Sequence, residues 1–132
     1  MHDIKLIKER ASSLRILVVD DDTLIRALMS SFMERIFGEV VSAMDGQEAL
    51  EKFDEFGTFD VVLTDIRMPR MNGRELIKEL RARDEKLFIA VMSGAPEEAG
   101  NDLEYCNMFL AKPVGFDNIL EMLSIMIQNK ES

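Results

Sequence analysis

Residues 14–22 read LRILVVDDD, so an apolar run ends abruptly in three aspartates. A second run, FDVVLTD at residues 59–65, also ends in aspartate. Runs rich in β-branched residues are typical of buried strands, and open parallel sheets bind ligands at the carboxyl ends of their strands. Carboxylates crowded at one such edge repel one another unless a proton or a cation neutralises them. The two runs together predict a metal ion beside a reactive carboxylate.

Five apolar runs alternate with amphipathic segments along the chain. The predicted strands cover residues 14–20, 39–44, 59–64, 87–92 and 108–111. Such alternation indicates parallel βα units with right-handed crossovers. We therefore expect an α/β fold, a flavodoxin-like doubly wound five-stranded parallel sheet in the order 2-1-3-4-5 with helices on both faces. This order places the first and third strands, with their aspartates, side by side.

The segment after the first strand predicts an amphipathic helix with Asp22 or Thr23 as its cap. Its apolar stripe has a regular helical period and comprises Leu24, Ile25, Leu28, Met29, Phe32, Met33 and Ile36. Asp45 is expected to cap the following helix. Residues 96–106 are polar and contain a proline and a glycine, so any helix there is expected to be short.

The first 13 residues stand apart from this alternation. Ile4, Ile7 and Ala11 fall at helical spacing with charged residues between them. The pattern fits a short helix packed on the domain, the end of a linker or a frayed terminus. We assign residues 1–13 to an N-terminal extension or linker and residues 14–130 to one domain, which suits a chain of 132 residues.

Composition narrows the class of protein. The formal net charge of −9 argues against direct nucleic-acid binding, which requires a basic surface. No apolar stretch approaches the roughly 20 residues of a transmembrane helix, and no signal-peptide pattern begins the chain. The single cysteine, Cys106, cannot form an intrachain disulfide, which fits a reducing compartment. We expect a cytoplasmic protein that does not bind membranes.

Residues capable of chemistry follow successive strands. Asp20 and Asp21 follow the first strand, Asp65 the third, Ser93 the fourth and Lys112 the fifth. Mg²⁺ prefers oxygen ligands, and a carboxylate can attack phosphorus to form an aspartyl phosphate. A lysine and a hydroxyl nearby supply the charge neutralisation and positioning that phosphoryl transfer needs. Each residue alone also fits a cap or a loop, and the specific signal is their succession at strand ends.

Four segments carry a resemblance to a known family. They are ILVVDDD at residues 16–22, DVVLTDIRMP at 60–69, MNG at 71–73 and LAKP at 110–113. As a set with this spacing, they resemble the response-regulator receiver domain of two-component signalling, over residues 14 to about 128. The resemblance implies a phosphorelay switch that accepts a phosphoryl group from a phosphohistidine on a sensor histidine kinase or a histidine phosphotransfer protein.

The resemblance also implies a role for each site residue. Asp65 is then the phosphoacceptor, and Lys112 contacts the phosphoryl group. Asp20, Asp21, Asp65 and the backbone carbonyl of Arg67 bind Mg²⁺, for which Mn²⁺ can substitute. Catalysis is limited to the domain's own Mg²⁺-dependent phosphorylation and dephosphorylation, so the protein is mainly a signalling switch.

Ser93 and Phe109 are implied to form that switch. Ser93 hydrogen-bonds the phosphoryl group, and Phe109 turns inward when Ser93 moves. Many relatives carry tyrosine where this chain has Phe109, so switching here rests on packing without a ring hydroxyl. The activated domain is expected to contact a downstream protein through the face formed by residues 93–128.

Three other classes were weighed against this interpretation. A haloacid-dehalogenase-like phosphatase needs an acid two positions after its nucleophile, where this chain has Arg67. A flavodoxin needs a Ser/Thr/Gly-rich phosphate loop after the first strand, where three aspartates would repel phosphate without a metal. A pseudo-receiver, an interaction module that does not need phosphorylation, stays open as the alternative.

Overall fold

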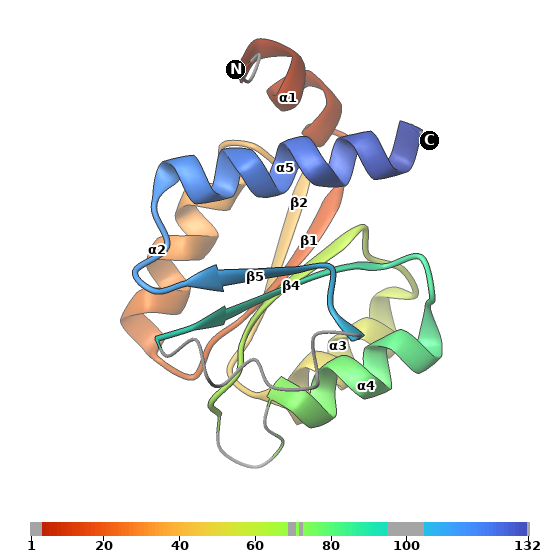
Figure 1. The fold of residues 1–132 in the computed structure, drawn as a ribbon. Coiled ribbons are helices and arrows are strands. Elements are labelled where there is room, and N and C mark those ends of the chain that lie inside the picture. The colour runs from red at the N-terminus through yellow and green to blue at the C-terminus, as the bar shows by residue number, and fades with distance from the viewer. Residues whose placement is uncertain (1–3, 69–70, 72, 95–104, 132) are drawn as a thin grey trace.

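The structure, a computed structural model, describes residues 4–68, 71, 73–94 and 105–131. The strands are β1 (Arg15–Val19), β2 (Glu39–Ala43), β3 (Val61–Asp65), β4 (Phe88–Ser93) and β5 (Met108–Ala111). The helices are α1 (Ile4–Ala11), α2 (Thr23–Glu34), α3 (Gly46–Phe56), α4 (Gly73–Arg83) and α5 (Phe116–Glu131). Helices and strands alternate from α1 to β4, and β5 and α5 are the next described elements (Figure 1).

The strands form one parallel sheet in the order β2-β1-β3-β4-β5, which confirms the predicted fold. β1 and β3 are neighbours, and Val19 lies opposite Thr64 in their register. The aspartates that follow these two strands are therefore at one edge of the sheet. We call it the carboxyl edge, because the strands end there, and we call the opposite edge the amino edge.

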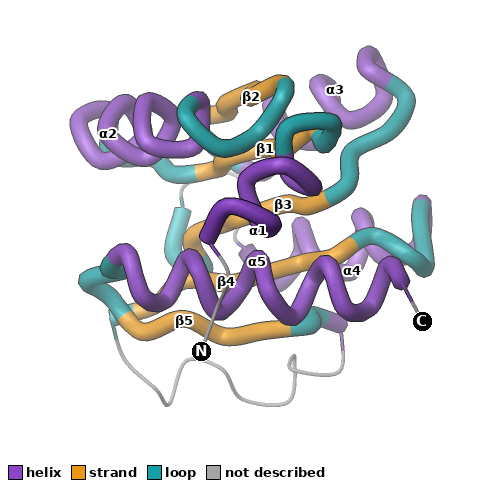
Figure 2. The backbone as a smooth tube through the Cα atoms, turned by 90° about the horizontal axis from the view of Figure 1, so that it is seen from above, coloured by secondary structure: helices purple, strands orange, loops and turns teal. Residues whose placement is uncertain are grey.

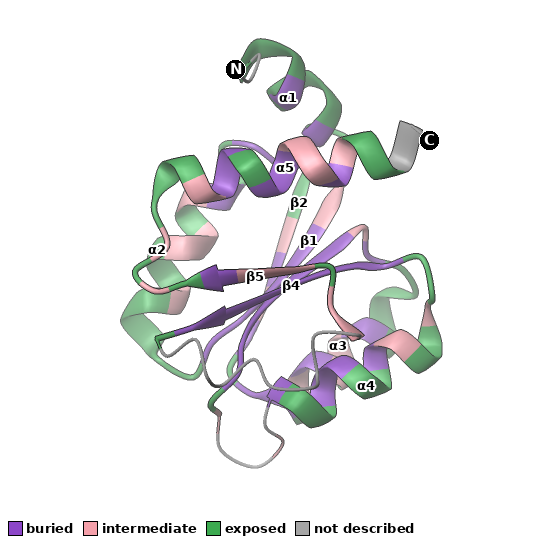
Figure 3. Ribbon diagram, viewed as in Figure 1, coloured by how far each residue is buried: buried purple, intermediate pink, exposed green. Residues whose placement is uncertain are grey.

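Two apolar cores, one on each face of the sheet, hold the helices in place. α2 and α5 cover one face, whereas α3 and α4 cover the other (Figure 1). The central strands β3 and β4 are buried along their whole length (Figure 3). Successive side chains of a strand point to opposite faces, so Val62 joins one core and Leu63 the other.

Residues 4–11 form helix α1. Of the three possibilities that the sequence left open, the structure shows the short helix packed on the domain. α1 contacts α5 and lies on the same face of the sheet as α2 and α5 (Figure 2). Ile7 and Ala11 are buried in the core that these helices share. The turn after α1 is tied to the amino edge, because the Leu14 carbonyl accepts hydrogen bonds from Gly38 N and Glu39 N at 3.0 and 3.2 Å.

Both predicted helix caps are confirmed. The Asp22 side chain accepts a hydrogen bond from Ile25 N at 3.0 Å, and the Asp45 side chain accepts one from Glu48 N at 2.8 Å. These bonds satisfy N–H groups that the first turn of a helix leaves without an intrahelical partner. Asp22 thus has a structural role at the carboxyl edge.

The predicted apolar stripe of α2 is only partly buried. Met33 is buried and Phe32 is partly buried, but Leu24 and Leu28 are 68% and 62% exposed. Periodicity shows that a helix is amphipathic, but it does not show how far the neighbouring elements extend along it. The first turns of α2 therefore present apolar side chains to solvent beside the carboxyl edge.

Two further expectations concern the helix predicted within residues 96–106 and the lack of a membrane-spanning helix. The short helix predicted within residues 96–106 falls mostly on residues 95–104, which lie outside the described residues. Within the ranges that the structure does describe, no helix combines the length and the apolar character needed to cross a membrane.

Candidate functional site

Three carboxylates converge at the carboxyl edge, as the sequence predicts. Asp20 and Asp21 extend from β1, and Asp65 is the last residue of β3. One oxygen from each of these side chains lies within 4.8 Å of the other two. Asp20 is fully buried and Asp65 is 7% exposed, whereas Asp21 is open to solvent. The cluster is thus anchored in the protein and accessible from one side.

Lys112, directly after β5, brings a positive charge to the same cluster. Its Nζ donates a hydrogen bond to Asp65 Oδ2 at 2.9 Å and forms an ion pair with Asp20 Oδ2 at 3.6 Å. Its backbone N–H donates to the Ser93 carbonyl at 2.8 Å, which fixes the start of its side chain beside β4. Lys112 thus brings a positive charge to a cluster of three carboxylates.

This crowding shifts the protonation of Asp20 and Lys112. Burial raises the pKa of Asp20 above its ordinary value, and the charges of Asp65 and Asp21 add to the rise; the hydrogen bond from Asp22 N and the charge of Lys112 oppose it. Burial alone lowers the pKa of Lys112, but the hydrogen bond to Asp65 and the negative charges outweigh it, so this pKa is raised. Lys112 therefore keeps its charge at neutral pH.

The oxygens of Asp20 indicate what the cluster lacks. Asp20 Oδ1 accepts a hydrogen bond from Asp22 N at 2.9 Å. Asp20 Oδ2 is buried, and no described residue donates a hydrogen bond to it. A buried anionic oxygen without a donor is costly. Carboxylate oxygens are the ligands that hard divalent cations prefer, so the residues present fit a site for such a cation.

The hydroxyl and the aromatic ring of the predicted switch lie on one face of the sheet. Ser93 is the last residue of β4 and is buried, and Phe109 in β5 is partly buried against the core that contains Val91. The register pairs Val91 with Phe109 and Ser93 with Ala111. Because side chains alternate along a strand, Ser93 and Phe109 point to the same face, two positions apart.

Arg67 lies two residues beyond Asp65 in the β3–α4 connection. Its backbone N–H donates a long hydrogen bond, 3.4 Å, to Asp65 Oδ1. The chain is held on either side of it, because Ile66 N donates to the Met92 carbonyl at 3.2 Å and Gly73 N to the Ile66 carbonyl at 2.8 Å. Arg67 is therefore near the cluster, and its ligand role stays a prediction.

One supporting residue was not found from the sequence. Arg26, in the second turn of α2, donates a hydrogen bond from Nη1 to the Asp20 carbonyl at 2.8 Å. The bond fixes the end of β1 and thus the direction in which the Asp20 side chain leaves it. Its position four residues after the Asp22 cap was the available signal, since the first turns of that helix had to lie beside the strand end.

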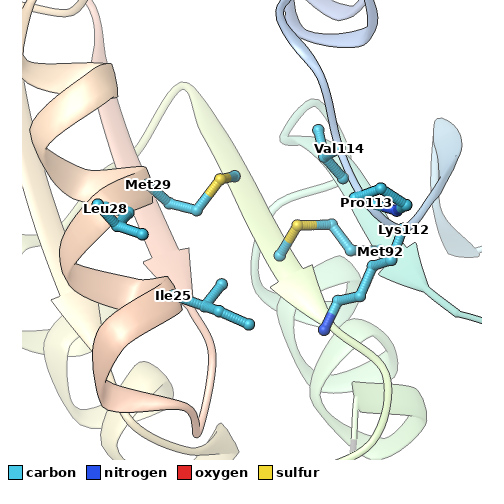
Figure 4. Close-up of a pocket in the computed structure, with 7 residues that line it drawn as sticks. All are labelled: Ile25, Leu28, Met29, Met92, Lys112, Pro113 and Val114. Atoms are coloured by element: carbon cyan, nitrogen blue, oxygen red, sulfur yellow. The ribbon is translucent and has the colours of Figure 1, made fainter.

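An apolar groove of about 520 Å³ lies beside the cluster, and the sequence did not predict it. Figure 4 shows side chains of α2 and of the segment after β5 facing each other across it. Its lining comprises Ile25, Leu28, Met29, Met92, Lys112, Pro113 and Val114. Lys112 thus borders both the apolar groove and the acidic cluster.

Comparison with known proteins agrees with this geometry. The sequence matches the family described as the response regulator receiver domain over residues 16–124. The match covers most of the chain, so this protein belongs to the receiver domain family of two-component response regulators. α1 lies before the matched region.

Individual relatives support the assignment. The chain is 31% identical to the protein-glutamate methylesterase/protein-glutamine glutaminase of Treponema denticola over 86% of its length, and 36% identical to the Regulator of RpoS of Escherichia coli over 64%. The matches span 34% and 25% of those two proteins. The chain thus corresponds to about a third or less of the length of these relatives.

Solved structures show the same fold. A CheY-like response regulator receiver domain protein from Methanospirillum hungatei superimposes with a TM-score of 0.81 at 27% identity, covering 90% of this chain and 98% of that chain. Response regulator TrrA from Thermotoga maritima, solved in complex with Mg²⁺-BeF, gives 0.77 at 30% identity, with 86% and 98% covered.

Proposed function

We propose that this domain accepts a phosphoryl group on Asp65 in a Mg²⁺-dependent reaction and then changes conformation to signal by protein contact. The observation that carries the proposal is the position of Lys112, with Nζ 2.9 Å from Asp65 Oδ2 and 3.6 Å from Asp20 Oδ2 at the edge where the carboxylates converge. Membership of the receiver family and the Mg²⁺-BeF complex of the Thermotoga relative support it.

The carboxylates of Asp20, Asp21 and Asp65 would hold the cation, with the Arg67 carbonyl proposed as a further ligand. When bound, Mg²⁺ supplies positive charge that neutralises the phosphoryl oxygens. The buried Asp20 oxygen without a donor is the feature of this chain that such an ion would satisfy. Mn²⁺, which also takes carboxylate and carbonyl oxygens, is proposed to substitute.

The transfer step follows from the nucleophile and its neighbour. A carboxylate oxygen of Asp65 forms a bond to phosphorus while the P–N bond to the donor histidine breaks. The electron pair of that bond returns to the imidazole, which takes up a proton. Lys112, held in its charged form, pairs with the phosphoryl oxygens as they leave the donor. The products are an aspartyl phosphate and a neutral histidine.

The proposed switch uses the shared face of Ser93 and Phe109. The Ser93 hydroxyl donates a hydrogen bond to the new phosphoryl group, and the movement of Ser93 makes room into which the Phe109 ring turns. The two conformations exist in equilibrium, and phosphorylation shifts their populations. The proposed output surface is the part of residues 93–128 that β5 and α5 contribute.

The proposed phosphodonor, a sensor histidine kinase or a histidine phosphotransfer protein, covers the apolar groove beside the cluster. Its phosphohistidine must reach Asp65, so the donor must lie over the carboxyl edge. Leu24 and Leu28 are exposed there, and Lys112 connects the groove to the phosphate site. An exposed apolar surface next to a reaction centre is typical of a protein-binding site. Such a surface binds a partner without relying on the net charge of either protein.

Phosphorylation itself tests the proposal. Radiolabelled acetyl phosphate with Mg²⁺ is expected to label the wild-type domain and to leave Asp65→Asn without label. Hydroxylamine is expected to remove the label, because acyl phosphates react with it. If the wild type takes up no label, or if Asp65→Asn is labelled equally, the proposal is wrong and the pseudo-receiver alternative gains support.

The donor surface has its own test. Leu28→Asp is expected to slow transfer from a phosphorylated histidine phosphotransfer domain at least tenfold while leaving labelling by phosphoramidate unchanged. Leu6→Asp on α1 is the matched control, since Leu6 is also exposed, at 44%, and lies outside the groove. Equal rates for both variants with the protein donor would show that the donor binds elsewhere.

A further inference from the structure

Helix α3 supports the metal site from a distance in sequence. We propose that Gly46, the first residue of α3, is a positioning residue for the cation site, because its missing side chain lets Met71, which follows β3, lie against the start of the helix. This inference rests on the proposed function, since it concerns the Mg²⁺ affinity of the same cluster. Gly46 is proposed to act through Met71, the residue nearest to the position of its missing side chain.

The contact between Gly46 and Met71 leaves no room for a side chain. A Cβ atom on Gly46 would lie 2.6 Å from the Met71 carbonyl oxygen and 2.8 Å from both Met71 Cβ and Met71 Cγ. Carbon atoms at ordinary contact are about 3.5–4.0 Å apart, so an alanine here must displace Met71. One of the three contacts is to backbone, which a change of rotamer does not relieve.

Hydrogen bonds tie the start of the helix to the residues that precede it and oppose a shift of the helix. The Asp45 cap accepts from Glu48 N at 2.8 Å, and the Glu48 side chain accepts from Met44 N at 3.1 Å, so both sides of the helix start are hydrogen-bonded. The preceding strand is fixed too, because Asp20 N donates to the Ala43 carbonyl at 3.2 Å. The displacement therefore falls on Met71 and the connection that contains it.

The connection carries Arg67, one of the proposed ligands. At its base Gly73 N donates a hydrogen bond to the Ile66 carbonyl, and Met71 lies against Gly46. Arg67 lies between Ile66 and Met71 in the sequence, and Asp65 immediately precedes Ile66. Moving Met71 outward is thus expected to move Arg67 relative to the carboxylates. Residues that position metal ligands are worth about 10–100-fold in metal affinity.

The test is the Mg²⁺ affinity of Gly46→Ala, measured by calorimetric titration of the whole chain. We expect the dissociation constant to rise about tenfold relative to wild type. Gly115→Ala is the matched control, because a Cβ atom there meets only Asn118 Oδ1 at 3.5 Å, an ordinary contact. The control is expected to bind Mg²⁺ within twofold of wild type. Urea unfolding without Mg²⁺ measures any separate loss of stability.

A second variant keeps the proposal testable if Gly46→Ala does not fold. Met71→Ala retains the glycine but removes most of the side chain that rests on it, and it is expected to weaken Mg²⁺ binding two- to fivefold. If wild type does not bind Mg²⁺, the proposed function fails. If wild type binds and the folded variants bind equally well, the proposed function stands and the positioning role of Gly46 is wrong.

Discussion

An aspartate stands at each end of β3, and the two have opposite surroundings. Asp60 precedes the strand at the amino edge, and Asp65 ends it at the carboxyl edge. Asp60 Oδ2 accepts a hydrogen bond from Arg15 N at 2.8 Å, and Asp60 N donates to the Arg15 carbonyl at 3.0 Å. Asp65 instead faces Asp20, Asp21 and Lys112. At the amino edge the Asp60 carboxylate meets a backbone donor, whereas at the carboxyl edge three carboxylates cluster.

Arg15 shows how completely the amino edge satisfies its polar groups. Its guanidinium pairs with Glu39 at 2.6 Å, donates to the Thr58 carbonyl at 2.9 Å and lies over the rings of Phe56 and Phe59 at 5.2 and 5.7 Å. Arg26 and Lys112 bring positive charge to the carboxyl edge, where three carboxylates cluster. The difference indicates that the amino edge stabilises the fold, whereas the proposed phosphoacceptor site at the carboxyl edge gathers like charges at the expense of stability.

The largest expected effect comes from removing the cation of the carboxyl edge. Lys112→Met is expected to slow labelling by phosphoramidate about 100–1,000-fold, because the developing charge on the phosphoryl oxygens loses its positive partner. Lys86→Met, at an exposed lysine far from the cluster, is the control and should leave the rate unchanged. Rates measured over a series of donor concentrations check this, and a Lys112→Met rate near that of wild type would contradict it.

Helix α1 at the other side of the molecule is expected to affect stability alone. Ile7→Ala should lower the free energy of unfolding by about 2–3 kcal/mol, because Ile7 is 6% exposed and packs in the core. Leu6→Ala, at a neighbour that is 44% exposed, should cost less than about 0.5 kcal/mol. Urea unfolding measures both variants. An Ile7→Ala variant as stable as Leu6→Ala would show that α1 is not held in solution.

The same substitution at the two ends of β3 separates the two edges. Asp60→Ala is expected to lower the free energy of unfolding by about 1–2 kcal/mol, since it leaves Arg15 N without its acceptor, and to keep phosphorylation. Asp65→Ala is expected to abolish phosphorylation with a smaller loss of stability. Urea unfolding and labelling of each variant give the result; equal loss of labelling in both would remove the distinction.

The smallest expected effect is a gain in stability from Asp20→Asn. The raised pKa of Asp20 means that the folded state holds its proton more tightly than the unfolded state, so this group's contribution to stability is lost as the pH rises through the folded pKa. At neutral pH without Mg²⁺, the variant should therefore be more stable by about 1 kcal/mol. Saturating Mg²⁺ should stabilise wild type more than the variant. The stability of both proteins is measured by unfolding at pH 7 with and without Mg²⁺. A variant that is less stable than wild type under both conditions would contradict the expected gain.

Much of the fold and of the site could be predicted from the sequence, because both depend on the residues at the ends of the strands. The apolar run that ends in Asp20 and the run that ends in Asp65 predict parallel neighbours, and parallel order then brings Ser93 and Lys112 to the same edge. The structure places Asp20, Asp21, Asp65 and Lys112 together, as this reasoning expects. Local sequence is sufficient here, because each residue is positioned by the strand that precedes it.

The remaining features depend on contacts between distant segments. Nothing in the sequence around Asp60 shows that Arg15, on another strand, supplies its donor. The approach of Met71 to Gly46 likewise depends on how two loops pack. The apolar stripe of α2 is evident in the sequence, but Leu28 is exposed because burial depends on what lies opposite the helix. The hydrophobic pattern of a segment predicts whether it is a strand or an amphipathic helix, but tertiary packing decides which residues the segment contacts.

The residue that receives the phosphoryl group is the most direct test of the role proposed for Asp65. The wild-type chain, incubated with phosphoramidate and Mg²⁺, is expected to gain the mass of one phosphoryl group, and peptide mapping after borohydride reduction is expected to place it on Asp65. Chelation of Mg²⁺ before adding the donor should prevent the gain. A chain that gains no mass, or that carries the group at another residue, would contradict the assignment of the carboxyl edge as a phosphoacceptor site.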